Sequence, residues 1–118
     1  MLDKVFVRQR DFMNLLREHD KLPEFPVDLG TKPGQRLIKE FIFNTIEELA
    51  EASFVLKNKM HRLTDDREFD FAHYKEELGD AFAFFIEICI LSDITADDLY
   101  WQFVKKNTEV AKKLENGY

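Results

Sequence analysis

Two short acidic motifs, about thirty residues apart, constrain this chain more than any other feature of its sequence. The first motif contains Glu48 and Glu51, and the second contains Glu77 and Asp80. Residues three apart on a helix lie on one face, separated by about 4.5 Å along the axis. Each acidic pair therefore shares a helix face, and antiparallel packing of the two helices would bring the four carboxylates together.

Carboxylates that converge in this way repel one another and lose hydration unless a cation lies among them. Oxygen ligands of this kind suit Mg²⁺, with Mn²⁺ as the expected substitute. Each motif lies inside an apolar stretch, whereas the competing interpretation, a solvated helix face, needs no apolar neighbours. The apolar neighbours are Leu49, Ala50, Ala52 and Phe54 in the first motif and Leu78, Ala81 and Phe82 in the second. We therefore predict a magnesium site formed by Glu48, Glu51, Glu77 and Asp80.

The rest of the pattern predicts a single all-α domain over residues 1–118, an antiparallel helical bundle of four main helices. The chain has only four glycines and three prolines, which favours helix over a turn-rich β fold. Asp70 and Thr95 are expected to cap the third and fourth helices. The expected helices span 2–19, 33 or 34 to about 61, 70–91 and 96–116, with a proline-rich loop over 21–33 and a polar connector over 62–68.

Apolar residues lie on more than one side of the second and third expected helices, and the chain has twelve phenylalanines. Helices of this kind need a second layer, and symmetric self-association commonly supplies it. We expect a bundle completed by oligomerisation, as a homodimer or homotetramer, with Trp101, Phe103 or the third helix near the interface. Gly79 inside the third helix is expected to allow close helix approach or to leave room for a ligand.

Charge and hydropathy exclude several classes of partner. A formal net charge of −6 argues against binding to a nucleic-acid backbone. The most apolar segment, Ala81–Leu91, is too short for a membrane span, so no membrane partner is expected. It contains Glu87, which is expected to pair with a basic residue or to lie at an interface. The lone Cys89 favours a structural role in a reducing compartment, and we expect a cytoplasmic protein.

The pattern Glu47-Glu48-x-x-Glu51 followed by Glu77-x-x-Asp80 resembles the signature of the all-α NTP pyrophosphatases. That superfamily includes the MazG proteins, the dCTP and phosphoribosyl-ATP pyrophosphatases, and the dimeric dUTPases. The resemblance covers residues 35–118 and implies that the four predicted ligands hold magnesium. A local similarity to the dimeric dUTPases adds Lys106-Asn107 and the closing Asn116-Gly117-Tyr118, although Val110 and Lys113 stand where those enzymes have an Asn and an Arg.

This resemblance implies that the protein hydrolyses a nucleoside triphosphate, with dUTP or dCTP expected, to the monophosphate and pyrophosphate. Glu47 and Glu48 are the expected catalytic residues. Glu47 would either orient or deprotonate the attacking water or help to hold another ion. Cations near the phosphates would stabilise the leaving group, and Gln9 is a candidate for a contact with the base. The expected substrate-binding residues are Gln9, Lys57, Lys59, Lys106, Asn107 and Lys113.

Other functions are compatible with the same sequence. A MazG-like hydrolase would act on a non-pyrimidine or non-standard triphosphate through the same site. A non-catalytic helical interaction protein would use the acids only to solvate a helix face. The two classes differ in their response to metal, because a binding module should show no Mg²⁺-linked rise in melting temperature.

Overall fold

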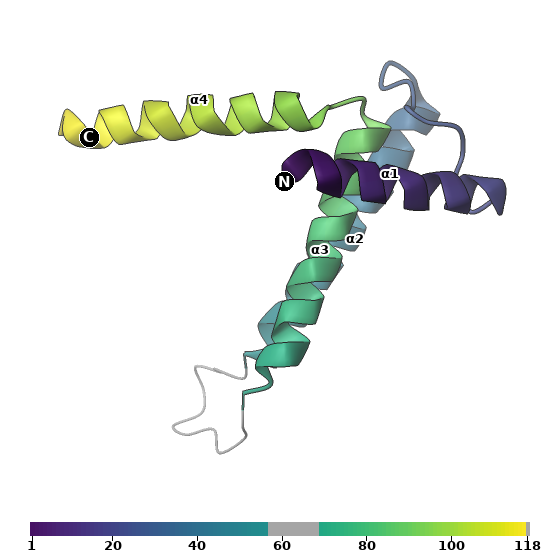
Figure 1. The fold of residues 1–118 in the computed structure, drawn as a ribbon, viewed down its shortest axis with the longest axis horizontal. Helices are drawn as coiled ribbons and strands as arrows, with labels where there is room; N and C mark the ends of the chain where they lie inside the picture. Colours follow the sequence, from purple (N-terminus) through teal and green to yellow (C-terminus); the bar gives the residue numbers. More distant parts are fainter. Residues whose placement is uncertain (57–68, 118) are drawn as a thin grey trace.

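The computed structural model of this protein describes residues 1–56 and 69–117, and the regular structure in these ranges is entirely helical (Figure 1). The elements in chain order are α1 (Leu2–Glu18), α2 (Lys32–Val55), α3 (Phe71–Leu91) and α4 (Ala96–Glu115). The predicted all-α class is confirmed, and the helix ends agree closely with the sequence pattern except for that of α2, which ends at Val55. The expected continuation of α2 over 57–61 and the connector over 62–68 lie outside the described residues.

Local capping chemistry sets the start of three helices. The Thr31 hydroxyl accepts a hydrogen bond from the backbone N–H of Gly34 at 3.2 Å, at the start of α2. The Asp70 carboxylate accepts one from the N–H of His73 at 3.0 Å and so begins α3, as predicted. At α4, Thr95 and Asp98 each accept from the other's backbone N–H at 3.0 Å, which forms a complete capping box.

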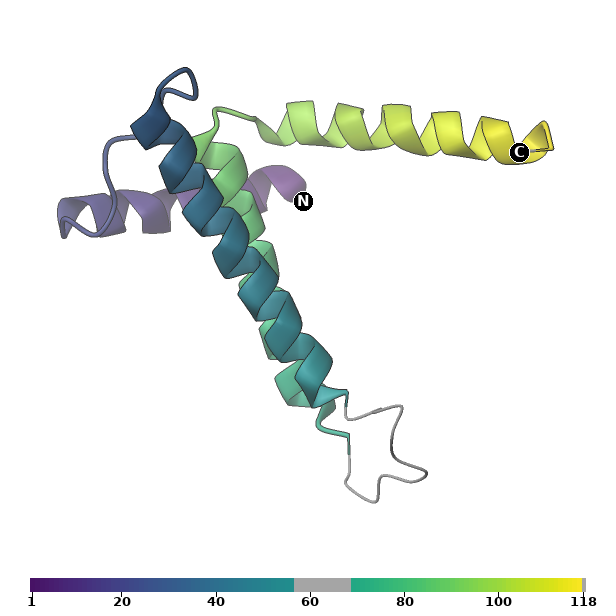
Figure 2. The ribbon, with the colours of Figure 1, turned by 180° about the vertical axis from the view of Figure 1, so that it is seen from behind.

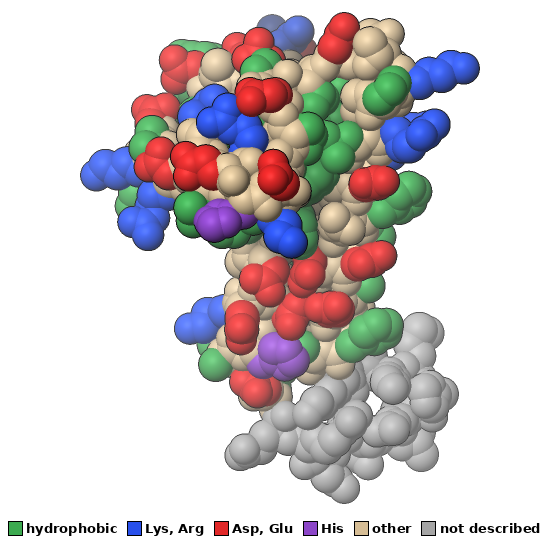
Figure 3. All heavy atoms as spheres, turned by 90° about the vertical axis from the view of Figure 1, so that its right-hand side faces the viewer, with side chains coloured by type: hydrophobic (Ala, Val, Ile, Leu, Met, Phe, Trp, Pro, Cys, Tyr) green, Lys and Arg blue, Asp and Glu red, His purple; other side chains and the backbone are tan. Residues whose placement is uncertain are grey.

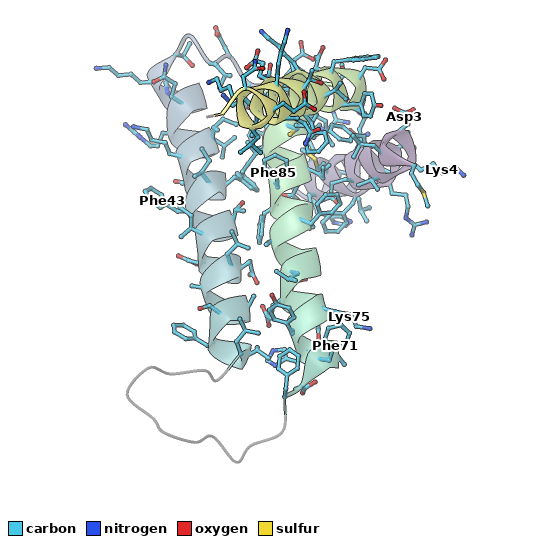
Figure 4. All side chains as sticks on the ribbon, turned by 90° about the vertical axis from the view of Figure 1, so that its left-hand side faces the viewer. Asp3, Lys4, Phe43, Phe71, Lys75 and Phe85 are labelled. Carbon is cyan, nitrogen blue, oxygen red and sulfur yellow. The ribbon has the colours of Figure 1, made fainter. Side chains whose placement is uncertain are left out.

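Helices α2 and α3 lie side by side and form the long arm of the molecule (Figures 1, 2 and 4). The chain leaves α2 and enters α3 at the same end, so the two helices run in opposite directions. We call this pair the α2–α3 hairpin. Its inner surface includes the rings of Phe41 and Phe84, whose centroids are 6.1 Å apart. Phe43 points outward from α2, away from α3 (Figure 4).

The hydrophobic core lies where α1 crosses the C-terminal half of α3. Met13, Ile86 and Leu91 are completely buried there, and Cys89 is buried beside them as predicted. Burial raises the pKa of the Cys89 thiol, which is consistent with a structural role. The loop between α1 and α2 closes one side of this core, and the N–H of Val27 donates to the carbonyl oxygen of Leu91 at 2.9 Å.

Two glycines have contrasting surroundings. A Cβ atom at Gly34 would overlap the backbone carbonyl oxygen of Asp28, so glycine allows the loop to approach the start of α2. A Cβ atom at Gly79 would meet no heavy atom within 4 Å. The expectation that Gly79 allows close helix approach is therefore wrong for the described residues. The other expectation, that Gly79 leaves room for a ligand, remains.

The chain does not close into a compact bundle by itself. Its radius of gyration is 18.1 Å, whereas a compact domain of this length has a value of about 13 Å. Helix α4 extends away from the hairpin (Figures 1 and 2), and among the described helices it contacts only α1. Trp101 and Phe103 on α4 are 63% and 65% exposed. Among the described residues, no helix is long and apolar enough to cross a membrane.

Candidate metal centre

Three of the four predicted ligands converge between the helices of the hairpin. Glu48 and Glu51 project from α2 and Glu77 from α3, and one carboxylate oxygen from each lies within 4.8 Å of the other two. We call these three residues the carboxylate cluster. Acidic side chains gather over this face of the hairpin in Figure 3. The helix spacing explains the convergence, because each motif places its acids on the side that faces the other helix.

One oxygen of the cluster has no hydrogen-bond partner. The Oε1 atom of Glu77 lies 2.9 Å from Nε2 of His73, one helical turn earlier on α3. Its Oε2 atom is buried and, within the described part of the chain, has no hydrogen-bond partner. A buried acceptor without a partner is costly. This oxygen therefore has the surroundings expected of an atom that receives a cation or a proton.

Crowding of the carboxylates changes their proton affinities. Burial, reinforced by the charge of Glu51 and by the neighbouring Glu77 carboxylate, raises the pKa of Glu48 to about 7. The nearby Glu77 carboxylate is also the main cause that raises the pKa of Glu51. The same proximity lowers the pKa of Glu77, because a proton on Glu51 would stabilise its ionised form, and His73 contributes in the same direction. Without a cation, a proton on Glu48 relieves the repulsion; a bound divalent ion would displace it.

Asp80 and Glu47 lie at the margin of the cluster. Asp80 is exposed, but its charge contributes to the raised pKa of Glu48, and the two residues line the same hollow. Glu47 is also exposed, and its charge contributes to the raised pKa of Glu51. The structure therefore brings together three predicted ligands. It places Asp80, the fourth predicted ligand, and Glu47, one of the two predicted catalytic residues, beside them.

Two hollows flank the carboxylate cluster and share its residues. The first has a volume of about 450 Å³ and is lined by Glu51, Phe54, Val55, Asp70, His73 and Glu77. The second has a volume of about 330 Å³ and is lined by Gln9, Phe12, Leu16, Glu48, Asp80, Ala83, Phe84 and Glu87. The cluster is therefore accessible from both sides along the hairpin, and each side offers room for part of a ligand.

Comparison of this chain with protein-family models, with curated proteins and with solved structures finds no significant match. The geometry of the carboxylates and the spacing of the two acidic motifs are therefore the features that indicate a function.

The far end of the second hollow contains a polar pair, a buried Glu87 and a partly buried Gln9. The Nε2 atom of Gln9 donates to Oε1 of Glu87 at 2.7 Å, and Glu87 is only 6% exposed. Glu87 was expected to pair with a basic residue or to lie at an interface. Its observed partner is an amide rather than a basic residue, and the interface stays a prediction. Burial raises the pKa of Glu87, and the bond from Gln9 only partly offsets that effect. Gln9 was predicted as a substrate contact, and the structure places it in a hollow that reaches Glu48.

Among the described residues, the predicted substrate contacts on α4 do not reach the cluster. Lys57 and Lys59 lie outside the described residues. Lys106, Asn107 and Lys113 lie on α4, which has no contact with α2 or α3 among the described helices. Their assignment to substrate binding stays a prediction.

The sequence interpretation missed His73. This residue lies in the first turn of α3, and its side chain is half-exposed. Its spacing of four residues from Glu77 was the available signal, because residues that far apart on a helix are neighbours. The contact makes His73 a candidate for orienting a metal ligand.

Proposed function

We propose that this protein is a Mg²⁺-dependent hydrolase that converts a nucleoside triphosphate to its monophosphate and pyrophosphate. The observation that carries the proposal is the convergence of Glu48, Glu51 and Glu77, one of which has a buried oxygen without a hydrogen-bond partner among the described residues. A cluster of this kind fits a hard divalent cation, because the cation would neutralise the repulsion and satisfy that oxygen. When bound, magnesium would supply positive charge for the phosphate oxygens and lower the pKa of a bound water.

In this proposal the acidic residues of the two motifs have separate roles. Glu48, Glu51 and Glu77 hold the ion, and Asp80 completes the ligand set from the rim of the second hollow. Glu47 lies next in sequence to the cluster, where it orients or deprotonates the attacking water or helps to hold another ion. The substrate is dUTP or dCTP, and attack at the α-phosphorus gives the two expected products.

The site is completed by a second copy of the chain in this proposal. One chain leaves large apolar side chains exposed on the hairpin and on α4, and in its extended shape no other described element covers them. A homodimer or homotetramer would complete the antiparallel bundle. It would also allow α4 of one copy to bring Lys106, Asn107 and Lys113 towards the carboxylates of another. Lys57 and Lys59 follow directly after α2 in the sequence and are proposed as further contacts to the leaving pyrophosphate.

The decisive test is pyrophosphate release from dUTP and dCTP with and without Mg²⁺. Glu51→Gln and Asp80→Asn should each lower turnover by roughly a hundredfold or more while the helical circular dichroism is preserved. Glu76→Gln is the matched control, because Glu76 is an exposed acid of the second motif that lies outside the cluster. Unchanged turnover in either of the first two variants, or release of orthophosphate with a nucleoside diphosphate, would contradict the proposal.

A second candidate function is supported by the exposed apolar faces. A helical interaction protein would use Trp101, Phe103 and their neighbours to bind a partner, and its acids would need no metal. A rise in melting temperature on addition of Mg²⁺ favours the enzyme, and no rise favours the interaction protein. Hydrolysis of purine or damaged triphosphates, tested in the same assay, identifies the MazG-like alternative. Because nucleoside triphosphates are cytoplasmic, the proposed activity also places the protein in the cytoplasm.

A further inference from the structure

The hollow that joins the carboxylate cluster to Glu87 has the chemistry of a selective binding site. It begins at Glu48 and Asp80 and ends at the pair formed by Gln9 and Glu87. Asp80 and Glu87 are seven residues apart on α3, which corresponds to about 10 Å along the helix axis. A compound with phosphates at the carboxylate end would therefore place its other end beside the Gln9–Glu87 pair.

The walls of this hollow suit a planar ring. Phe12 and Leu16 line it from α1, and Ala83 and Phe84 line it from α3. Phe12 remains about half exposed and Phe84 is partly buried, so both rings offer surface to a ligand. Aromatic and apolar walls with a few polar groups at one end are typical of small-molecule sites. The small side chain of Ala83 keeps the hollow open between the two ends.

The buried Glu87 carboxyl of this pair determines which ring edge can bind. A carboxyl group accepts a hydrogen bond in either protonation state, whereas it donates one only when it is neutral. An exocyclic amino group on the ligand therefore always finds an acceptor at Glu87. An oxo group in the same position is repelled when Glu87 is ionised. Glutamate accordingly reads cytosine through its amino group.

We infer that this hollow binds a nucleobase that carries an amino group where uracil carries an oxo group, as in cytosine or adenine, and that Gln9 and Glu87 select for it. Gln9 holds the Glu87 carboxyl through its amide N–H, and its amide oxygen is a second acceptor for the same amino group. The inference rests on the proposed function, which puts the phosphates at the carboxylate cluster. It narrows the expected pyrimidine substrates from two to one, with dCTP preferred over dUTP.

The test uses calorimetric binding of nucleotide pairs that differ at this position to the full-length chain with Mg²⁺. The pairs are dCMP with dUMP and dAMP with dIMP, and 2-deoxyribose 5-phosphate is the probe without a base. At least one amino-bearing nucleotide should bind tenfold or more tightly than its oxo counterpart and than the probe without a base. Equal affinity within both pairs, or no binding of any probe, overturns the inference.

Variants test whether Gln9 and Glu87 cause the difference in affinity within each nucleotide pair. Glu87→Leu should abolish the difference within each pair, and an apolar residue of similar size is usually tolerated at a buried acid. If that variant fails to fold, Gln9→Leu and the cavity-filling Ala83→Leu test the same site: the first should reduce selectivity, and the second should weaken every nucleotide but not 2-deoxyribose 5-phosphate. Glu76→Gln should keep the full difference. Retained selectivity in folded Glu87→Leu protein overturns the assignment.

Binding and hydrolysis report on separate proposals. Pyrophosphate release without discrimination between dCTP and dUTP or between dATP and dITP would leave the hydrolase standing and reject the selective hollow. Discrimination between the monophosphates without any pyrophosphate release would support the hollow and reject the hydrolase.

Discussion

The imidazole Nε2 of His73 lies 2.9 Å from the Oε1 atom of Glu77, one turn further along α3. This contact fixes one oxygen of the carboxylate and leaves the other, buried and without a partner among the described residues, at the cluster. Groups that hydrogen-bond to a metal ligand orient it and commonly affect the affinity for the metal.

Removal of the imidazole should therefore weaken Mg²⁺ binding. We expect His73→Ala to reduce Mg²⁺ affinity by roughly tenfold or more, because Glu77 would lose the bond that orients it. Mg²⁺ titration monitored by calorimetry measures this effect without any substrate. His19→Ala is the control, since His19 is exposed at the end of α1. Equal Mg²⁺ affinity in the His73 variant and the wild type would show that the contact has no role in binding.

The raised pKa of Glu48 predicts a specific pH dependence of stability. The folded-state pKa of about 7 lies above the ordinary value of 4.5, so the folded protein binds more protons than the unfolded chain between these values. Protonation of Glu48 should therefore stabilise the folded, metal-free protein fully below pH 4.5, and this contribution to stability should be lost as pH rises through about 7. Thermal unfolding in a chelator should show this decline, and Glu48→Gln should flatten it.

Addition of Mg²⁺ should reverse the sign of this pH dependence. The ion binds the deprotonated carboxylates, so the stabilisation that it gives should increase as pH rises through the same window. The shift in melting temperature on addition of Mg²⁺, measured at several pH values, tests this expectation. A Mg²⁺ shift that is independent of pH would show that the ion does not compete with protons at the cluster.

The two glycines provide a matched pair of stability tests. Gly79→Ala should stabilise the protein by about 1 kcal/mol, because alanine is the better helix former and its Cβ meets nothing within 4 Å. Gly34→Ala should destabilise it, because the added Cβ overlaps the Asp28 carbonyl oxygen. Urea unfolding measures both changes. Lost turnover in a stabilised Gly79→Ala protein would indicate that the open space beside Gly79 accommodates substrate.

The extended shape of the chain predicts self-association. Light scattering at micromolar concentration should give at least twice the monomer mass of 14.0 kDa. The melting temperature should also rise with protein concentration, as expected when folding and association are linked. Trp101→Glu should weaken association by placing a charge on an exposed apolar face of α4. An active species at the monomer mass would contradict this prediction.

Local features of this fold could be predicted from the sequence, whereas contacts between distant elements could not. The caps at Asp70 and Thr95 depend on residues within one turn, and the pattern identified both. The meeting of Glu48 with Glu77 followed from two helix faces in one hairpin. The contact between Gln9 and Glu87 joins residues 78 positions apart, and no local rule indicates how α1 crosses α3. The apolar pattern of α4 likewise indicates that one face of this helix must be buried, but it does not indicate which surface packs against that face.

The carboxylate cluster lies apart from the hydrophobic core along the α2–α3 hairpin. The core reaches Ile38 on α2 and Ile86 on α3, whereas beyond it towards the far end the buried apolar residues are only Ala52, Val55 and Ala81 among those described. Segments with few buried contacts open locally at lower free energy than the rest of a protein. The far half of the hairpin should therefore exchange its amide hydrogens faster than the core. A cation that joins the two helices there would slow this exchange between 46 and 55 and between 71 and 80, and would leave the amides of the core unaffected.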